Sequence, residues 1–228
     1  MTAAGTGAAP DVLSVPAGLL LLVGTGYVDA YTFLEHGGVF AEAMTGNLVL
    51  IAVGALRPEV VAFWRPLVAY LAFVAGVAAL WLSATRPALR GRRHPQLATL
   101  LLEVVVLLAV GALPGDAPDV PVILAIAFVS GLQIAAFRTV GQAAFTTTVM
   151  TTNSMRAVVA ALEAVGARSA EARRRAVGQA LPLVAFVAGA FAGAAASTGL
   201  GGRAAFPAAA VFAVTALLYV RQRRRPAP

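Results

Sequence analysis

Long apolar runs alternate with short polar or arginine-rich stretches along most of the chain. Six of the runs have close to the ~20 apolar residues that a transmembrane helix needs. Two shorter apolar stretches, 44–56 and 146–165, follow glycine- or threonine-rich residues and are interrupted by polar ones. The pattern predicts an all-α integral membrane protein with about six transmembrane helices and two short helices that are re-entrant or broken. The six long runs are residues 12–34, 60–84, 96–113, 120–137, 177–199 and 204–220.

The composition indicates that lipid surrounds most of the chain. Of the 228 residues, 60% are hydrophobic and 12% are charged, whereas soluble domains are about 45–50% apolar and about 25% charged. A soluble fold of this length could not bury so much apolar surface. We therefore expect a single transmembrane domain over residues 12–220, preceded by a disordered tail, 1–11, and followed by a basic cytoplasmic tail, 221–228.

Arginine placement predicts the orientation. All 17 basic residues are arginine, gathered mainly at 86–93, 168–175 and 221–225 between or after apolar runs. Such clusters are typical of cytoplasmic loops, so both termini are expected to be cytoplasmic and nucleic acid is not expected as a partner. The chain has no cysteine, which excludes disulfides and thiolate metal sites.

Counting crossings between the arginine clusters restricts the two short stretches. The run 120–137 already carries the chain from the outer side at Asp119 to the inner cluster at Arg168. The stretch 146–165 therefore cannot be a second full crossing and should be re-entrant or part of a broken helix. By the same argument, 44–56 must return to the outer side.

The two short stretches resemble each other and indicate an internal repeat. GYVDA at 26–30 and MTGN at 44–47 correspond to GLQIA at 131–135 and MTTN at 150–153. The offset is 105 residues for the first pair and 106 for the second. Each half makes an odd number of crossings, so the second copy should be inverted relative to the first. The expected repeats are 12–113 and 120–220.

These motifs resemble the YoaK-type family of bacterial multi-pass membrane proteins, a domain family of unknown function. The resemblance covers nearly the whole chain, and its most specific parts are the T-G-N segment and Asp29 of the first helix. It implies a bacterial-type inner (plasma) membrane location without an established substrate. In the second half, Thr152 stands opposite Gly46 and Ile134 opposite Asp29, so the two half-sites are not expected to be equivalent.

Inverted repeats with interrupted helices in corresponding positions are typical of transporters and place the binding site near the bilayer midplane. Backbone groups freed by a broken helix must face protein or a wet cavity, because lipid cannot satisfy them. The alternative is that the threonines and asparagines only cap helix starts. The expected substrate-binding residues are Asp29, Thr45, Gly46, Asn47, Gln133, Thr151 and Asn153.

Ionisable residues inside a membrane are costly, which makes them functional candidates. Asp29 would bind a cation or carry a proton, or else form a structural ion pair with an arginine or reach the outer interface. Glu103 is either a proton-linked carboxylate or a partner in a helix–helix hydrogen bond. The isolated histidines are expected to be solvated in loops. The expected gating or ion-pair residues are Glu42, Glu103, Arg138 and Arg156, and the two histidines are His36 and His94.

Gly189 and Gly193 form a GxxxG motif, whose small face packs either inside one chain or in a homodimer. No enzyme motif, metal pattern or cofactor loop is present in the sequence, so we expect no cofactor and no catalytic activity. The prediction is a transporter or channel-like protein for an unknown small solute or ion, with the lipid bilayer as its other partner. A non-transporting scaffold or partner subunit is the alternative. A polar cavity reaching Asp29 would favour transport.

Overall fold

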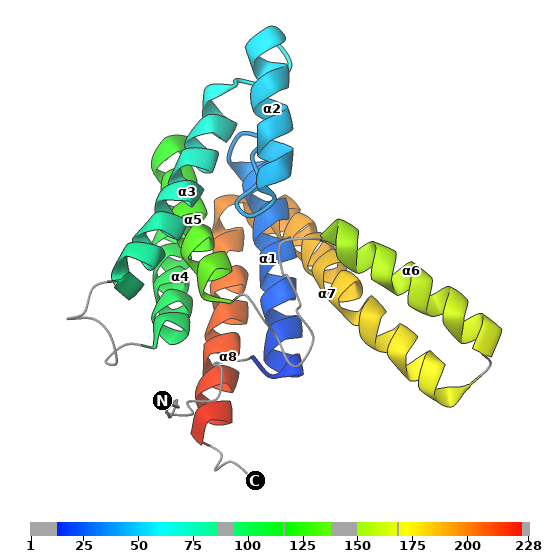
Figure 1. The fold of residues 1–228 in the computed structure, drawn as a ribbon. Helices are drawn as coiled ribbons and strands as arrows, with labels where there is room; N and C mark the ends of the chain where they lie inside the picture. The colour runs from blue at the N-terminus through cyan, green and yellow to red at the C-terminus, as the bar shows by residue number, and fades with distance from the viewer. Residues whose placement is uncertain (1–12, 86–93, 116, 138–149, 168, 225–228) are drawn as a thin grey trace, which may run out of the picture.

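The computed structural model describes residues 13–85, 94–115, 117–137, 150–167 and 169–224. This part of the chain is built from helices and short connections and has no strand, which confirms the all-α prediction (Figure 1). The elements are α1 (Val15–Glu35), α2 (Met44–Leu56), α3 (Trp64–Thr85), α4 (Pro95–Gly111), α5 (Asp119–Ala136), α6 (Met150–Ala167), α7 (Ala170–Leu200), a 3₁₀ helix η2 (Gly201–Ala204) and α8 (Ala205–Arg224).

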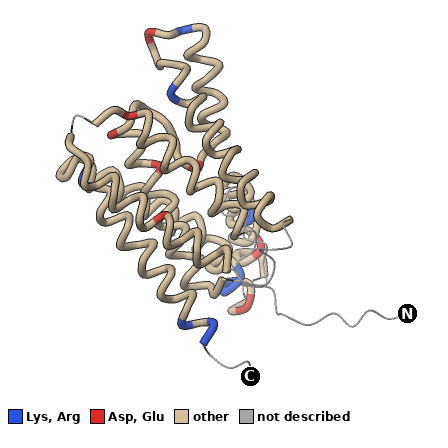
Figure 2. The backbone as a smooth tube through the Cα atoms, turned by 90° about the vertical axis from the view of Figure 1, so that its left-hand side faces the viewer, with Lys and Arg blue, Asp and Glu red and all other residues tan. Residues whose placement is uncertain are grey.

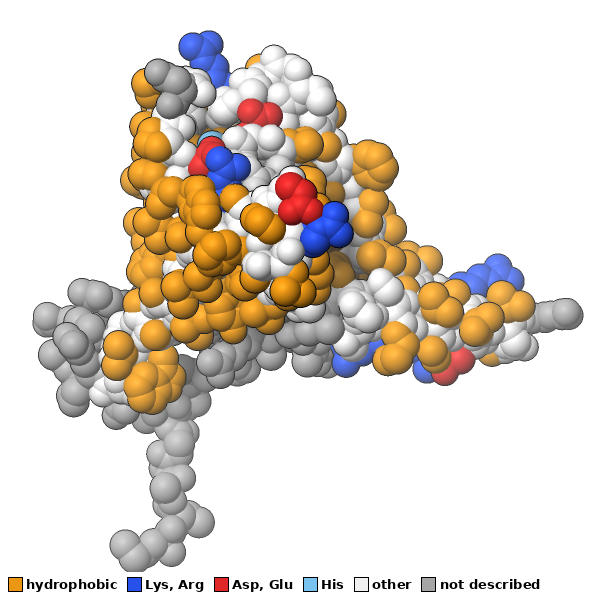
Figure 3. All heavy atoms as spheres, turned by 90° about the horizontal axis from the view of Figure 1, so that it is seen from above, with side chains coloured by type: hydrophobic (Ala, Val, Ile, Leu, Met, Phe, Trp, Pro, Cys, Tyr) orange, Lys and Arg blue, Asp and Glu red, His pale blue; other side chains and the backbone are white. Residues whose placement is uncertain are grey.

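Membrane-spanning character is evident in four helical stretches that are long and apolar enough to cross a bilayer. They are α1, α3, α5 and the continuous stretch Ala170–Arg224, whereas α2 and α4 are apolar but shorter. Hydrophobic side chains cover much of the molecule's surface in the space-filling view (Figure 3). Trp64 and Trp81, near opposite ends of α3, are exposed by 39% and 62%. Lipid can cover this surface, which water would not favour.

A glycine turn after α1 positions the start of α2. Gly37 and Gly38 have φ values of 77° and 75°, a left-handed conformation that glycine adopts without steric cost. The chain then comes back along α1, and the Glu42 backbone N–H donates to Asp29 Oδ1 at 2.8 Å. α2 starts at this depth and runs outward again beyond the end of α1 (Figure 1). The short helix therefore starts near Asp29 and ends beyond the end of α1 (Figure 1).

α1 and α7 cross at glycines, in parallel orientation. A Cβ added at Gly26 would lie 2.1 Å from the Phe186 carbonyl oxygen, and one at Gly189 would lie 2.0 Å from the Val23 carbonyl oxygen. Gly193 faces the Tyr27 carbonyl oxygen in the same way, at 2.4 Å. Only glycine allows the two backbones to come this close. The GxxxG face is thus occupied inside one chain, and a homodimer through it would require α1 and α7 to separate.

α3 and α5 form a second parallel pair that also crosses at glycines. A Cβ at Gly76 would lie 2.1 Å from the Phe128 carbonyl oxygen. A Cβ at Gly131 would lie 2.2 Å from the Phe73 carbonyl oxygen. α4 packs between α5 and α8, and α8 also contacts α1. The chain is therefore organised around two glycine-based crossings joined by α4 and α8.

A polar cluster ties the end of α1 to the starts of α3 and α5. His36 Nδ1 lies 3.3 Å from Asp119 Oδ1, and Arg65 Nη2 lies 3.1 Å from Asp119 Oδ2. His36 Nε2 also lies 2.9 Å from the Tyr31 hydroxyl. His36 is only 8% exposed, so the expectation that it is solvated is wrong. Its packing among helix ends overrides its position in a loop, and burial lowers its pKa although Asp119 opposes this effect.

The cluster also fixes helix directions, because α1 ends where α3 and α5 begin. α1 and α7 therefore run opposite to α3 and α5. At the other end of the bundle, the Ser14 backbone N–H, just before α1, donates to Gln222 Oε1 in α8 at 2.7 Å. The arginines that end α8 lie near the same end of the molecule (Figure 2). The described ends of the chain are thus close together.

Candidate functional site

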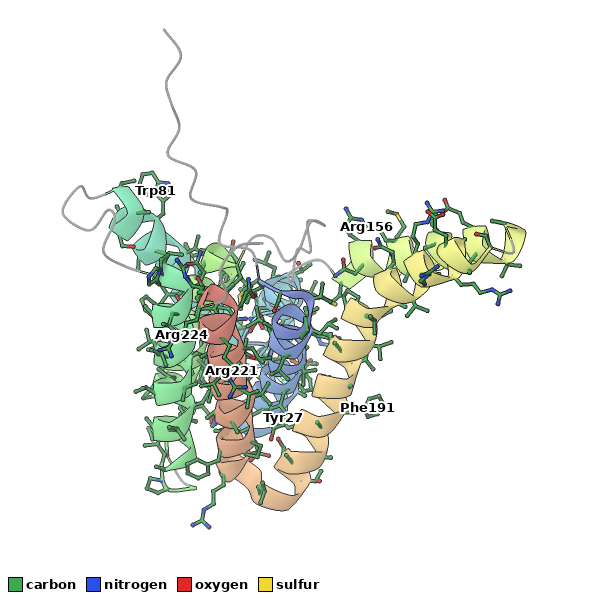
Figure 4. All side chains as sticks on the ribbon, turned by 90° about the horizontal axis from the view of Figure 1, so that it is seen from below. Tyr27, Trp81, Arg156, Phe191, Arg221 and Arg224 are labelled. Atoms are coloured by element: carbon green, nitrogen blue, oxygen red, sulfur yellow. The ribbon has the colours of Figure 1, made fainter. Side chains whose placement is uncertain are left out.

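A cavity of about 760 Å³ opens beside α1, between the returning segment, α2, α6 and α7. Its polar lining includes Asp29, Glu42 and Thr25, together with Thr45 and Thr151 near the starts of α2 and α6. Phe191 points outward from α7 at the rim and is 74% exposed (Figure 4). The remaining wall is mostly apolar. It consists of Gly26, Ala30, Phe33, Leu34, Phe40, Ala43, Met44, Ile134, Met150, Phe186, Val187, Ala190, Phe191 and Ala194.

Asp29 faces the cavity and also organises the chain beside it. Its Oδ1 accepts backbone N–H bonds from Glu42 at 2.8 Å and from Ala43 at 3.3 Å. Asp29 is 5% exposed. Within the described residues no salt bridge joins it to an arginine. The structural ion pair considered for this residue is therefore absent there, and backbone donors hold the carboxylate in place.

Glu42 and Gln133 connect the two halves of the sequence at the back of the cavity. Gln133 Nε2 donates to Glu42 Oε1 at 3.0 Å and to Thr25 Oγ1 at 3.4 Å. Glu42 and Gln133 are 4% and 1% exposed. Glu42 thus lies deep inside the protein, held by a residue that follows it by 91 positions.

Glu103 is the third buried carboxyl group of this region. It lies on α4, is 1% exposed and does not line the cavity. Its electrostatic neighbour is Glu42. Within the described part of the chain neither of its carboxyl oxygens has a hydrogen-bond partner, so a helix–helix hydrogen bond does not account for it there.

Asn47 and Gly46 support the loop rather than face the cavity. Asn47 Oδ1 accepts from the Phe40 backbone N–H at 3.0 Å, and its Nδ2 donates to the Phe40 carbonyl oxygen at 2.7 Å. Asn47 is fully buried. A Cβ at Gly46 would lie 2.9 Å from the Phe40 ring. Both residues therefore hold the turn that brings Thr45 to the cavity.

The second short helix contributes Met150 and Thr151 to the cavity lining. Thr151 lines the cavity, whereas Asn153 is buried at 4% exposure and its Nδ2 has no partner among the described residues. Arg156 lies on the exposed side of α6 (Figure 4). Arg138 falls outside the described residues. The corresponding asparagines thus differ in role, as the departure from exact repetition suggests.

Sequence reasoning missed Thr25 and Ser130. Thr25 lies four positions before Asp29, and Ser130 three positions before Gln133, so each shares a helix face with a recognised candidate. Ser130 is fully buried and its hydroxyl has no partner in the described part of the chain. Helical spacing from Asp29 and Gln133 was the signal that would have found both.

Comparison with known proteins places the chain in a family. The family described as "Protein of unknown function (DUF1275)" matches residues 17–218. The chain belongs to the DUF1275 family. The match extends from α1 into α8, so the whole helical domain is the family's unit. No curated protein and no solved structure matches the chain. DUF1275 membership gives no activity, and function must be argued from the cavity.

Proposed function

We propose that this DUF1275 protein is a transporter or channel-like protein for a small solute, with its binding site in the cavity at Asp29. The observation that supports this proposal most strongly is the set of residues that line the cavity. Asp29, Thr45 and Thr151 meet there from three helices, α1, α2 and α6, the last of which lies in the other half of the sequence. A membrane protein has no structural need for an open space of this size beside a buried carboxylate, whereas a solute-binding site requires both.

The packing of glycines supports an inverted repeat. Gly131 and Phe128 follow Gly26 and Val23 by 105 residues, the offset found between the first helices of the two halves. Gly189 and Phe186 follow Gly76 and Phe73 by 113 residues. The α1–α7 crossing therefore has the same glycine–carbonyl contacts as the α5–α3 crossing. Since the two pairs run in opposite directions, they are related by a two-fold axis in the proposed membrane plane.

Six crossings and two re-entrant helices follow from this arrangement. The repeats would contain α1 to α4 and α5 to α8, with α2 and α6 as the short helices. In each repeat the third helix packs against the first helix of the other repeat. The contact between Ser14 and Gln222 favours both termini on one side, which the arginines of α8 would make cytoplasmic in a bacterial-type inner membrane.

The wall of the cavity favours a small amphipathic solute over a hydrated ion. Its sides are built from alanine, leucine, isoleucine, valine, methionine and phenylalanine side chains, and its few polar groups lie near Asp29. A hydrated ion would lose water without gaining enough ligands from such walls. An organic molecule with an apolar body and a cationic or hydrogen-bond-donating end would satisfy both parts of the lining.

A scaffold or partner subunit remains the second candidate, favoured by the apolar outer face of α6. Met155, Val158, Leu162 and Val165 are exposed by 60%, 59%, 68% and 75%. α6 packs mainly along α7 and extends away from the bundle (Figure 4). Such a face suits lipid or a partner's transmembrane helix. A scaffold would need this face and would tolerate a filled cavity.

A matched pair of substitutions on α7 tests the proposal. Ala190 lines the cavity, whereas Ala188 does not and is exposed. Purified wild-type protein would be screened by thermal shift against small amines, amides and alcohols. For any stabilising compound, Ala190→Phe is expected to weaken binding at least about tenfold by filling the cavity, with Ala188→Phe unchanged. Equal binding by both variants would contradict a cavity site, and a screen in which no compound binds would favour the scaffold.

A further inference from the structure

We propose that Glu42 and Glu103 form a proton-binding pair at the back of the cavity, with both carboxyl groups protonated when no solute is bound. The proposal goes beyond the function above because it names the coupling ion. Its relevance to coupling rests on the cavity being a transport site, but proton binding by the pair is a property of the solute-free protein.

The two glutamates differ in their access to the cavity. Glu42 lines it, whereas Glu103 is 1% exposed and is not part of the lining. Glu103 therefore lies behind Glu42, on α4, and interacts with it electrostatically. Two anionic carboxylates in this position would repel each other in an environment with little water to screen them.

Within the described residues, no salt bridge joins either glutamate to an arginine or a histidine. The salt bridges there join His36 and Arg65 to Asp119, and Arg57 to Glu59. They lie on the side of the molecule where α1 ends. The elements packed around the pair add Asp29 from α1, which is itself acidic, and Gln133 and Ser130 from α5, which are neutral. α8 contributes Tyr219 and Arg223, whose described contacts lie toward Gln96 at the start of α4.

Several buried polar atoms around the pair lack hydrogen-bond partners in the described structure, and protons on the glutamates would supply donors to them. Within the described residues, hydrogen-bond partners are missing for Glu42 Oε2, Gln133 Oε1 and both carboxyl oxygens of Glu103. Ionised carboxylates and amide oxygens only accept hydrogen bonds, so these atoms lack donors rather than acceptors. The buried Ser130 hydroxyl, also unpartnered, can supply a single donor. A proton on each glutamate would add two O–H donors to the same region.

A proton is a better occupant than a metal ion. No group of three or more His, Cys, Asp or Glu side chains able to hold a metal occurs in the part of the chain that the structure describes. One oxygen of Glu42 is also taken by the amide N–H of Gln133. The free Oε2 can take a proton without disturbing that bond.

In the exchange step, one O–H bond of a hydronium ion breaks and one O–H bond forms on Glu42. A hydronium ion in cavity water gives its proton to Glu42 Oε2, which leaves a water molecule and a neutral carboxyl group. Release is the reverse. Asp29 interacts electrostatically with Glu42, so a cationic group that neutralises Asp29 would weaken proton binding at Glu42 by adding positive charge. This linkage would couple cation binding to proton release.

Infrared spectroscopy of the solute-free protein in detergent at neutral pH tests the pair directly. Protonated carboxyl groups have a C=O stretching band separate from that of carboxylates. Glu42→Gln and Glu103→Gln are each expected to remove about half of the band, since each carboxyl carries one proton. The control Glu163→Gln changes an exposed glutamate of α6 and should leave the band unchanged.

Two further measurements test whether the band comes from protons on the glutamate pair. Glu103→Asp keeps the carboxyl group and is expected to shift the band rather than remove it. Replacing choline chloride by sodium chloride is expected to have no effect. The proposal is overturned if Glu42→Gln and Glu103→Gln match the wild type, or if sodium abolishes the band. A failed solute screen with the band present would contradict the proposed function and leave the proton pair standing.

Discussion

Asp29 shows how one side chain serves both structure and site. Its Oδ1 accepts two backbone N–H groups from the segment that returns along α1, and the same residue lines the cavity. Because an aspartate and an asparagine both offer Oδ1 as an acceptor, the structural role can be separated from the charge by substitution.

Asp29→Asn is expected to keep the fold and to weaken binding of a cationic solute, because the acceptor remains and the charge is lost. Asp29→Ala leaves two backbone donors without their acceptor and should lower stability by about 1–3 kcal/mol. Thermal unfolding of both variants in detergent checks this. Equal destabilisation by the two variants would show that charge, not hydrogen bonding, holds the segment.

His36 gives a pH-dependent prediction at the edge of the bundle. Its pKa in the folded protein lies below the ordinary value of 6.5 because of burial. The unfolded chain therefore binds more protons as pH falls through 6.5, and the folded state loses stability. Wild-type protein should lose more thermal stability than His36→Asn between pH 8 and about 5.5. A parallel loss in both proteins would mean that His36 does not control this response.

Some site residues could be predicted from sequence because their chemistry is unusual in an apolar helix. Asp29 and the two threonines at corresponding helix starts were recognised in this way, and all three line the cavity. The role of Asn47 could not be predicted from the sequence, because its hydrogen-bond partner is a backbone segment whose turn depends on two left-handed glycines. The Glu42–Gln133 contact joins residues 91 positions apart, and no local pattern encodes it.

At the scale of elements, two crossings at glycines hold the bundle together. In both, a glycine of one helix meets a backbone carbonyl group of the other. Such close approach allows van der Waals contact between backbones, the main source of helix association in lipid. The two crossings should therefore respond alike to an added methyl group.

Gly26→Ala and Gly131→Ala are each expected to destabilise the protein by about 1–3 kcal/mol, because the new Cβ would overlap a carbonyl oxygen. Gly178→Ala is the matched control on α7, where a Cβ would meet nothing within 4 Å. It should be neutral or stabilising by up to about 1 kcal/mol, since alanine favours helix. Unfolding midpoints in one detergent compare the three. Tolerance at Gly131 with loss at Gly26 would argue against equivalent crossings.

Helix positions followed from the apolar pattern, but helix ends did so only in part. The run expected at 177–199 belongs to α7, which starts at Ala170 and includes Arg173 to Arg175. The apolar run does not include these arginines, whereas the helix does, because arginine is a good helix former. Ser169 caps the start, accepting the Ala172 backbone N–H at 3.1 Å. The apolar pattern marks the lipid-facing part of a helix and not its full length.

For the molecule as a whole, the proposed site requires water to reach a cavity deep in a bundle with an apolar exterior. The apolar exterior makes the membrane the natural surroundings (Figure 3). Two of the polar groups at the cavity, Thr45 and Thr151, come from the starts of α2 and α6, which occupy corresponding positions in the proposed repeats. The positions of the helices and the polar starts of the two short ones could be predicted from sequence, and the repeat stays a prediction. The cavity's volume and its apolar wall depend on how α1 and α7 cross, which the sequence does not specify.

The most direct test is the reactivity of cysteines placed in the cavity, since the natural chain has none. Thr45→Cys and Thr151→Cys would be treated in membrane vesicles with a small thiol reagent that does not cross lipid. Leu48→Cys, exposed on α2 but outside the cavity lining, is the control. A water-filled site predicts reaction at both cavity positions and little at the control. Reaction at neither cavity position until the vesicles are dissolved in denaturant would contradict the account.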